Sequence, residues 1–269
     1  VLPLPLYFCA YFSKIRRFYY TMKKIITLVL ALAMAVSLFT GCGKKKTSKL
    51  EKGDISSGTV VMMVGDYQVR YSEVMAYCYF LKCQYEDSFG KELWNYKLSE
   101  NETIGDQAKQ EIVNMITQLK VISGVAQEQE VSLSADEQDE ALRQAESLVQ
   151  NATAADKKTY SLSVQKISEI YQENFLAEKM FYVATDDADT NVSDEEARQA
   201  ILDEKAKTAS GAAIGTEEDE TAITQDMISQ QKEVIIQQRQ SDMFVKKYNQ
   251  WLQDKKVDIN QSFWNDFSL

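Results

Sequence analysis

The stretch that decides the fold is residues 104–137, IGDQAKQEIVNMITQLKVISGVAQEQEVSLSADE, in which a long amphipathic run is followed by a helix start. Apolar side chains recur every three or four residues along this run, and they are Ile112, Met115, Ile116, Leu119, Ile122 and Ala126. This period places them on one face of an α-helix. The segment Ser134-Ala135-Asp136-Glu137 has the spacing of a capping box. We therefore predict a helix over residues 104–128 and another that begins after Ser134.

Upstream of this run, the sequence predicts a small hairpin and a first helix. The apolar residues 60–64, three of them β-branched valines, meet a Gly65-Asp66 turn signal, and a second short extended run follows. Ser72 is a suitable N-cap for a helix whose apolar face continues to about Ser88.

Downstream, further caps predict two more helices. Ser163 and Ser193 each precede an amphipathic segment, and the second segment runs to about Thr208. Residues 206–220 then combine small residues with an acidic run, which indicates an acidic mobile loop.

The last part of the chain, residues 221–269, predicts a long Gln-rich helix to about Lys255 and a short strand near Val257. The tail carries three large aromatic side chains, which we expect to dock on the rest of the chain: Phe263, Trp264 and Phe267. No proline occurs after Pro5, and this favours long uninterrupted helices. The predicted fold is mainly α, a multi-helix domain with one or two short strands, completed by the long C-terminal helix.

The N-terminal region predicts export. A basic start at Met22-Lys23-Lys24 is followed by an apolar run over residues 25–39, which is the layout of a secretory signal. Residues 38–42, LFTGC, resemble the lipobox of bacterial lipoproteins. The resemblance implies a signal peptide over residues 22–41 and lipidation of Cys42, whose acyl chains would hold the protein on a membrane. A transmembrane anchor is the alternative, but the run is shorter than the roughly 20 residues needed to span a bilayer.

Two flanking segments complete this interpretation. Residues 1–21 hold both prolines and no acidic side chain, and we interpret them as upstream of the true start at Met22. Residues 42–58 are rich in Lys, Ser and Gly and predict a flexible tether. The expected location is the extracytoplasmic face of a bacterial cell membrane.

Composition excludes several classes of function. The 269 residues carry 30 basic and 40 acidic side chains, so the net charge is −10 and nucleic acid is not an expected partner. Histidine is absent, which removes the commonest general base and the commonest metal ligand. Cys78 and Cys83 are five apart on one predicted helix and point in different directions, so we expect free thiols.

The order of these motifs is more specific than any one of them. The strand and turn at residues 64–69, the capped helix after it, the long helix ending near Val131 and the helix starts at Ser134 and Ser193 resemble the N-terminal chaperone domain of SurA and PrsA type foldases. The resemblance places that domain at residues 59–205. Residues 239–260 look like the helix and strand with which PrsA-type chains re-enter the domain, so residues 221–269 are expected to pack back on it.

Members of that family usually carry a parvulin prolyl isomerase between these two parts. That domain is several times longer than the segment 206–220, which stands in its place here. It also usually has histidines in its active site, and this chain has none. The isomerase is therefore expected to be missing. A prolyl isomerase with a reduced catalytic segment remains the alternative from the enzyme class.

The resemblance implies a membrane-anchored holdase that binds unfolded or partly folded exported polypeptides in an apolar groove between helices. Flexible Met and aromatic side chains suit such adaptable binding. The candidate client-binding residues are Tyr79, Phe80, Phe89, Trp94, Met115, Tyr171, Phe175 and Met180. The alternative for each of these residues is that it belongs to the core. For the whole protein, a third hypothesis is an envelope adaptor lipoprotein that binds one specific partner.

Neither a metal nor a cofactor is predicted, and no residue is predicted to be catalytic. The segment Asp187–Asn191 places oxygens at alternating positions, as an EF-hand loop does. However, Val192 stands where that loop needs glycine and Arg198 where it needs a bidentate glutamate. We interpret the segment as a solvated acidic linker.

Overall fold

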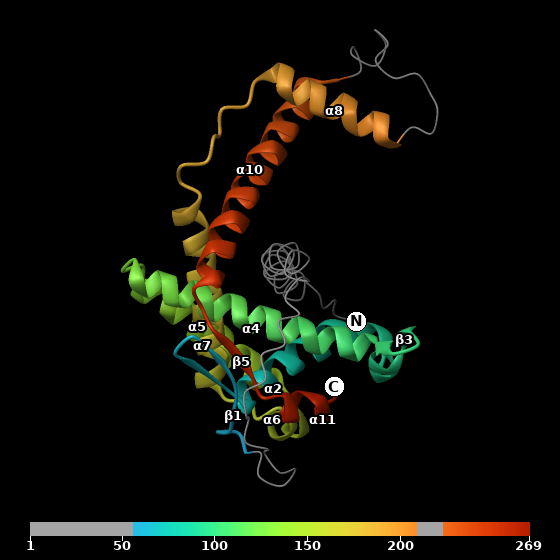
Figure 1. Ribbon diagram of the computed structural model, residues 1–269, viewed down its shortest axis with the longest axis vertical. Helices are drawn as coiled ribbons and strands as arrows, with labels where there is room; N and C mark the ends of the chain where they lie inside the picture. The colour runs from blue at the N-terminus through green and yellow to red at the C-terminus, as the bar shows by residue number, and fades with distance from the viewer. Residues whose placement is uncertain (1–55, 209–222) are drawn as a thin grey trace, which may run out of the picture. The chain divides into compact units, whose positions relative to one another are not determined.

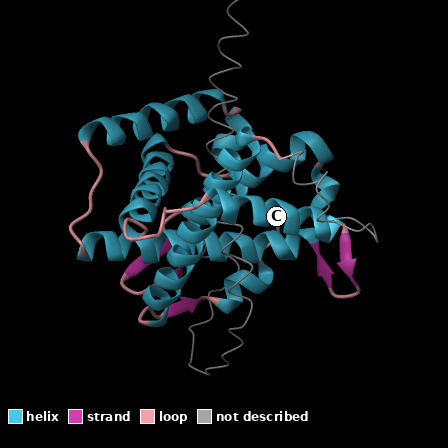
Figure 2. Cartoon of the chain, turned by 90° about the horizontal axis from the view of Figure 1, so that it is seen from above, coloured by secondary structure: helices cyan, strands magenta, loops and turns pink. Residues whose placement is uncertain are grey.

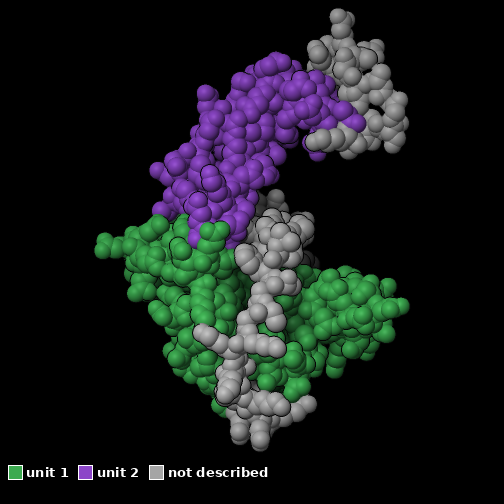
Figure 3. Space-filling model, in the orientation of Figure 1, with its two compact units in different colours: residues 1–180, 251–269 green, residues 181–250 purple. Residues whose placement is uncertain are grey.

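The computed structural model describes residues 56–208 and 223–269. The predictions for the upstream segment, the signal, Cys42, most of the tether and most of the acidic loop fall outside these residues. The described chain forms two compact units, coloured separately in Figure 3. Unit 1 comprises residues 56–180 and 251–269, and unit 2 comprises residues 181–208 and 223–250.

The prediction of a mainly α fold is confirmed, because helices make up most of the described chain (Figures 1 and 2). The helices are α2 (Tyr71–Leu81), α3 (Asp87–Phe89), α4 (Ile104–Glu128), α5 (Ala135–Asn151), α6 (Ala154–Thr159), α7 (Val164–Ala184), α8 (Asp194–Thr208), α10 (Gln225–Gln253) and α11 (Gln261–Asp266). A π-helical segment, η1 (Lys82–Glu86), joins α2 to α3, and a 3₁₀ helix, η2 (Lys91–Asn95), follows Gly90.

Two small antiparallel sheets belong to unit 1. The first has the order β2-β1-β5, from β2 (Tyr67–Arg70), β1 (Val60–Val64) and β5 (Val257–Ile259). Gly65 has a positive φ of 55° in the turn between β1 and β2, where a residue without Cβ is favoured. The second sheet is a hairpin of β3 (Lys97–Ser99) and β4 (Glu102–Thr103), which the sequence pattern did not reveal. Because β5 pairs with β1, segments from the two ends of the described chain share one sheet.

Unit 1 has its apolar core around α4, the long green helix of Figure 1. Thr103 and Asp106 form a capping box at its start, and Gly105 lies in its first turn. Its inward residues pack with those of β1, β2, α2 and α7. The most deeply buried aliphatic side chains of this core include Val61, Val64, Val69, Val74, Ile112, Ile116, Ile122, Ile167 and Ile170.

The first helix begins differently from the prediction. The cap position is Arg70 and not Ser72, because the chain passes directly from β2 into α2, and no side chain caps this helix. The Ser72 backbone N–H donates to Ser57 O at 3.1 Å. The helical path then continues through η1 to Phe89, and Gly90 ends it with a φ of 76°.

The other predicted caps are confirmed. The side chain of Ser134 accepts from Glu137 N and the Glu137 carboxylate accepts from Ser134 N, as a capping box requires. Ser163 Oγ accepts from Lys166 N at 3.2 Å, and Ser193 Oγ accepts from Glu196 N at 3.1 Å.

Unit 2 is built from the end of α7, the helix α8 and most of α10. One apolar cluster of unit 2 is formed by the buried side chains of Ala197, Ile201, Ile223 and Ile228. Cations of α10 hold the acidic segment before α8 and the first turn of α8. Arg239 donates to Asp189 Oδ2 at 3.1 Å and to Glu196 Oε1 at 2.5 Å. Lys247 pairs with Asp187 at 3.0 Å. In the described parts of the chain, no helix combines the length and the apolar character that crossing a membrane requires.

Candidate functional site

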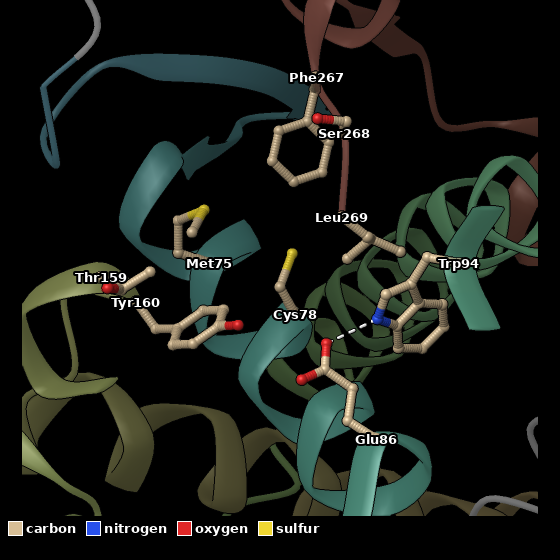
Figure 4. A pocket seen from close by; sticks show the side chains of 9 residues that line it. All are labelled: Met75, Cys78, Glu86, Trp94, Thr159, Tyr160, Phe267, Ser268 and Leu269. Carbon is tan, nitrogen blue, oxygen red and sulfur yellow. Dashed lines mark hydrogen bonds between the residues drawn. The ribbon is translucent and has the colours of Figure 1, made fainter. Parts of the chain in front are cut away.

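A cavity of about 150 Å³ lies within unit 1, between elements that are far apart in the sequence (Figure 4). Its walls come from α2, η1, η2, the end of α6 and the tail after α11. The lining residues are Met75, Cys78, Glu86, Trp94, Thr159, Tyr160, Phe267, Ser268 and Leu269. Most of these side chains are apolar or aromatic, so the space suits an apolar guest with a few polar contacts at its rim.

Trp94 forms one wall, and three neighbours fix its position. Its indole Nε1–H donates to Glu86 Oε1 at 2.7 Å, the dashed line of Figure 4. Tyr85 meets the indole edge to face, with ring centroids 6.2 Å apart. A Cβ on Gly105 would lie only 2.9 Å from the Trp94 carbonyl oxygen, so this close approach of the two backbones requires glycine.

Met75 and Cys78 form the wall that α2 contributes. Both side chains are buried, and Figure 4 shows the Cys78 sulfur directed towards the space between Trp94 and Tyr160. Burial raises the pKa of the Cys78 thiol to about 12. A thiol with so high a pKa is a poor nucleophile, so this wall favours binding over chemistry.

The end of α6 holds Tyr160 at the cavity. Asp156 pairs with Lys82 of η1, and the Lys82 ammonium lies 5.8 Å from the ring centroids of both Tyr79 and Tyr160. The two tyrosine rings are themselves 5.4 Å apart. The hydrogen bond from Lys82, with a second from Thr153, lowers the pKa of Asp156.

A buried charged cluster joins three helices of the same unit. Lys120 Nζ of α4 lies 2.6 Å from Glu73 Oε1 of α2 and 2.5 Å from Glu173 Oε1 of α7. The Lys120 and Glu73 side chains are 8% and 4% exposed. Burial lowers the pKa of Lys120, but the two carboxylates more than offset this, so the pKa lies above its ordinary value.

The acids of this cluster are also perturbed. Burial raises the pKa of Glu173, although Lys120 opposes the shift. The Tyr77 hydroxyl is buried beside the cluster without a hydrogen-bond partner among the described residues, and burial together with both carboxylates raises its pKa. The cluster joins α2, α4 and α7 through the two ion pairs of Lys120.

The eight residues proposed from the sequence occupy different environments. Four are buried (Tyr79, Trp94, Tyr171 and Met180), three are half-buried (Phe80, Met115 and Phe175), and Phe89 is 67% exposed. Phe80 stacks on Tyr171 with ring centroids 6.1 Å apart. Of the eight, Trp94 lines the cavity.

Sequence reasoning did not place Met75, Cys78 and Tyr160 in a site. Met75 and Cys78 fall on the buried side of α2, where periodicity predicts core residues, and Tyr160 is an isolated aromatic residue between two helices. In contrast, the aromatic tail was expected to dock, and Phe263 and Trp264 are buried in unit 1.

Other apolar side chains are exposed in the segment from the end of α3 to β3. Phe89, Tyr96 and Leu98 are 67%, 66% and 46% exposed, and Trp94 lies in the same segment. The segment that supplies Trp94 to the cavity wall therefore also carries exposed apolar side chains. Within the described ranges, no group of three Cys, Asp or Glu side chains is arranged to hold a metal ion.

Comparison with known protein families identifies the domain in the first part of the chain. The family model of the SurA-like N-terminal domain matches residues 12–177, more than half of the chain. A search of curated proteins gave no match, and a search of solved structures gave none. The matched domain points to a chaperone-related role with polypeptide clients. The chain belongs to the family of SurA-like N-terminal domains.

Proposed function

We propose that this protein is a holdase, which binds unfolded exported polypeptides at the outer face of a bacterial membrane without covalent chemistry. The observation that carries the proposal is the match of the SurA-like N-terminal domain over residues 12–177. The arrangement of unit 1 supports it, because a segment that carries exposed apolar side chains also supplies one wall of a cavity lined by aromatic and sulfur-containing side chains.

The energetics of such a surface suit weak capture. Burying one large apolar side chain is worth about 1.5–3 kcal/mol, and association itself costs several kcal/mol. Four such contacts, through Phe89, Tyr96, Leu98 and the cavity, would supply about 6–12 kcal/mol, and the cost of association leaves only weak net binding. Clients would then be held while unfolded and released when they fold and bury the same side chains.

Anchoring is the second part of the proposal. The basic and apolar segments before Cys42 and the LFTGC sequence support a lipid attached to the Cys42 sulfur. Replacement Cys42→Ala is expected to abolish incorporation of a radiolabelled fatty acid and to prevent processing. Unchanged labelling of the C42A chain would rule out this anchor.

The isomerase alternative receives less support. Only residues 209–224 separate α8 from α10, and this interval is shorter than a typical domain of roughly 50 residues or more. The holdase is therefore the preferred function.

Equilibrium binding tests the proposal. The chain from residue 42, with Cys42→Ser to leave out the lipid, should bind reduced and carboxymethylated α-lactalbumin, which is permanently unfolded. It should not bind the native, disulfide-bonded form of the same protein, because that form buries its apolar side chains. Equal binding of both forms, or binding of neither, would refute the holdase proposal.

A further inference from the structure

The tail after β5 covers part of the apolar surface of unit 1. Phe263 is buried and meets Tyr71 of α2 edge to face, with ring centroids 5.8 Å apart. Phe263, Trp264 and Phe267 also contact one another, at centroid distances between 5.1 and 5.6 Å. Phe267 and Leu269 then form one wall of the cavity (Figure 4).

This docking is incomplete in two respects. The Trp264 indole N–H is buried and has no hydrogen-bond partner among the described residues, which costs free energy in the docked state. The cavity beside Phe267 and Leu269 is about 150 Å³, a volume that in an apolar protein cavity is large enough to hold benzene. The polar anchor of the tail is a hydrogen bond from Lys109 Nζ to Phe267 O, at 3.0 Å.

We propose that the surface under residues 261–269, together with the cavity, is where this chain binds its clients, and that the tail occupies it in competition with them. The proposal rests on the holdase function. The guest would be an unfolded segment that carries an aromatic side chain and, two residues later, an aliphatic one, as Phe267 and Leu269 do. The tail itself shows that the surface accepts this chemistry.

The sheet keeps the displaced tail close. β5 pairs with β1 through Val257–Ile259, and Asn260 N donates to Val61 O at 3.0 Å. Because β5 stays paired when α11 leaves, the tail competes at the high effective concentration of a tethered ligand, about millimolar for short tethers. Weakly apolar segments are thereby excluded, and segments with several large side chains displace the tail.

The first experiment removes the competitor. A chain of residues 42–260 with Cys42→Ser should bind a fluorescent peptide of residues 261–269, and carboxymethylated α-lactalbumin should displace the peptide. The chain of residues 42–260 should also bind carboxymethylated α-lactalbumin several-fold more tightly than the chain of residues 42–269 does. If both chains bind the client equally and the tail peptide does not compete, the tail proposal is wrong while the holdase stands. If neither chain binds the client, the holdase proposal itself fails.

A second variant leaves the tail in place, in case the shortened chain does not fold. Lys109→Gln removes the charged hydrogen bond to Phe267 O and should make the tail open more often. The reporter is Cys78, which is buried at the cavity, in the chain of residues 42–269 with Cys42→Ser and Cys83→Ser, where it is the remaining cysteine. Its reaction with a thiol reagent should be roughly two- to tenfold faster in K109Q.

Lys158→Gln is the matched control, because it removes the same charge from the exposed surface of α6. It should leave the rate at Cys78 unchanged. Equal rates at Cys78 in K109Q and in the unsubstituted background would contradict a tail that opens over the cavity.

Discussion

At the scale of single residues, Trp94 depends on a glycine of the neighbouring helix. The Trp94 backbone lies against the first turn of α4, where an added Cβ on Gly105 would meet the Trp94 carbonyl oxygen at 2.9 Å. The backbone fixes the position of this Cβ, and the Trp94 oxygen is itself a backbone atom, so no side-chain rotation can relieve the contact. The cavity wall therefore depends on a residue that does not itself line the cavity.

Gly105→Ala should accordingly lower the free energy of unfolding by about 1–3 kcal/mol, because the two segments must move apart. The change should also alter Trp94 fluorescence. Chemical denaturation measures the first effect, and an unchanged or higher stability would contradict the contact.

Gly124→Ala provides the control in the same helix. Its Cβ would meet the ring of Tyr67 at 3.3 Å, and this ring is half-buried at the end of a side chain, so it can shift by a few tenths of an ångström. The gain in helix propensity, up to about 1 kcal/mol, should offset the crowding, so we expect a change of less than about 1 kcal/mol.

At the scale of elements, α6 is a six-residue helix that depends on its contacts with η1. Asp156 connects the two, because it pairs with Lys82 and also accepts from the cap residue Thr153. The pKa of Asp156 is lower in the folded chain than its ordinary 3.8. Its stabilising contribution is therefore complete above pH 3.8 and is lost as the pH falls through the lower folded value.

Asp156→Asn should loosen α6 locally. Amide hydrogen exchange over residues 157–160 should be up to about fivefold faster at neutral pH, since a partly exposed ion pair is worth up to about 1 kcal/mol. Asp136→Asn on the exposed first turn of α5 is the control and should not affect α6. Unchanged exchange in D156N would show that the pair with Lys82 does not hold this helix.

Lys120 connects α2, α4 and α7 in the same way, but in a buried environment. Lys120→Met would leave Glu73 and Glu173 without their cation and should cost about 3–5 kcal/mol of stability. Lys166→Met removes the partner of Glu169 at the surface, a pair 2.5 Å apart, and should cost less than about 1 kcal/mol. Equal losses in denaturant titrations would contradict the structural role of the buried cluster.

The K120M chain should also show a distinct pH dependence. Burial raises the pKa of Glu173 above its ordinary 4.5, so the folded chain binds this proton more tightly than the unfolded chain does. Stability must then rise as the pH falls from 7 towards 4.5. A K120M chain whose stability is independent of pH in this range would contradict the raised pKa of Glu173.

Elements whose signals are local could be predicted from the sequence. The bounds of α4 and the caps at Ser134, Ser163 and Ser193 follow from contacts three or four residues apart. The prediction of Ser72 as the N-cap was wrong, because the preceding strand, and not a side chain, determines where α2 begins. The cavity could not be predicted, since Trp94, Tyr160 and Leu269 meet only through long-range packing, which periodicity does not encode.

At the scale of the whole molecule, each of the two units has buried apolar side chains of its own. Ile112 is fully buried in unit 1 and Ile228 is fully buried in unit 2. Each isoleucine contacts the core of its own unit, so the two cores are expected to respond independently to substitution.

Ile228→Ala should cost about 2–5 kcal/mol locally and reduce exchange protection in α8 and the first part of α10. Ile112→Ala should have the same effect on β1, α2 and α4. Parallel loss of protection across both units in either variant would contradict two separate cores.

Suppression of aggregation is the most direct test of a chain that captures apolar segments. Chemically denatured citrate synthase is diluted into buffer with the chain of residues 42–269, Cys42→Ser, and light scattering is followed. We predict that scattering is suppressed at a near-stoichiometric ratio of the chain to citrate synthase, and that serum albumin at the same ratio has no comparable effect. Scattering that is unchanged at this ratio would contradict the function proposed for this protein.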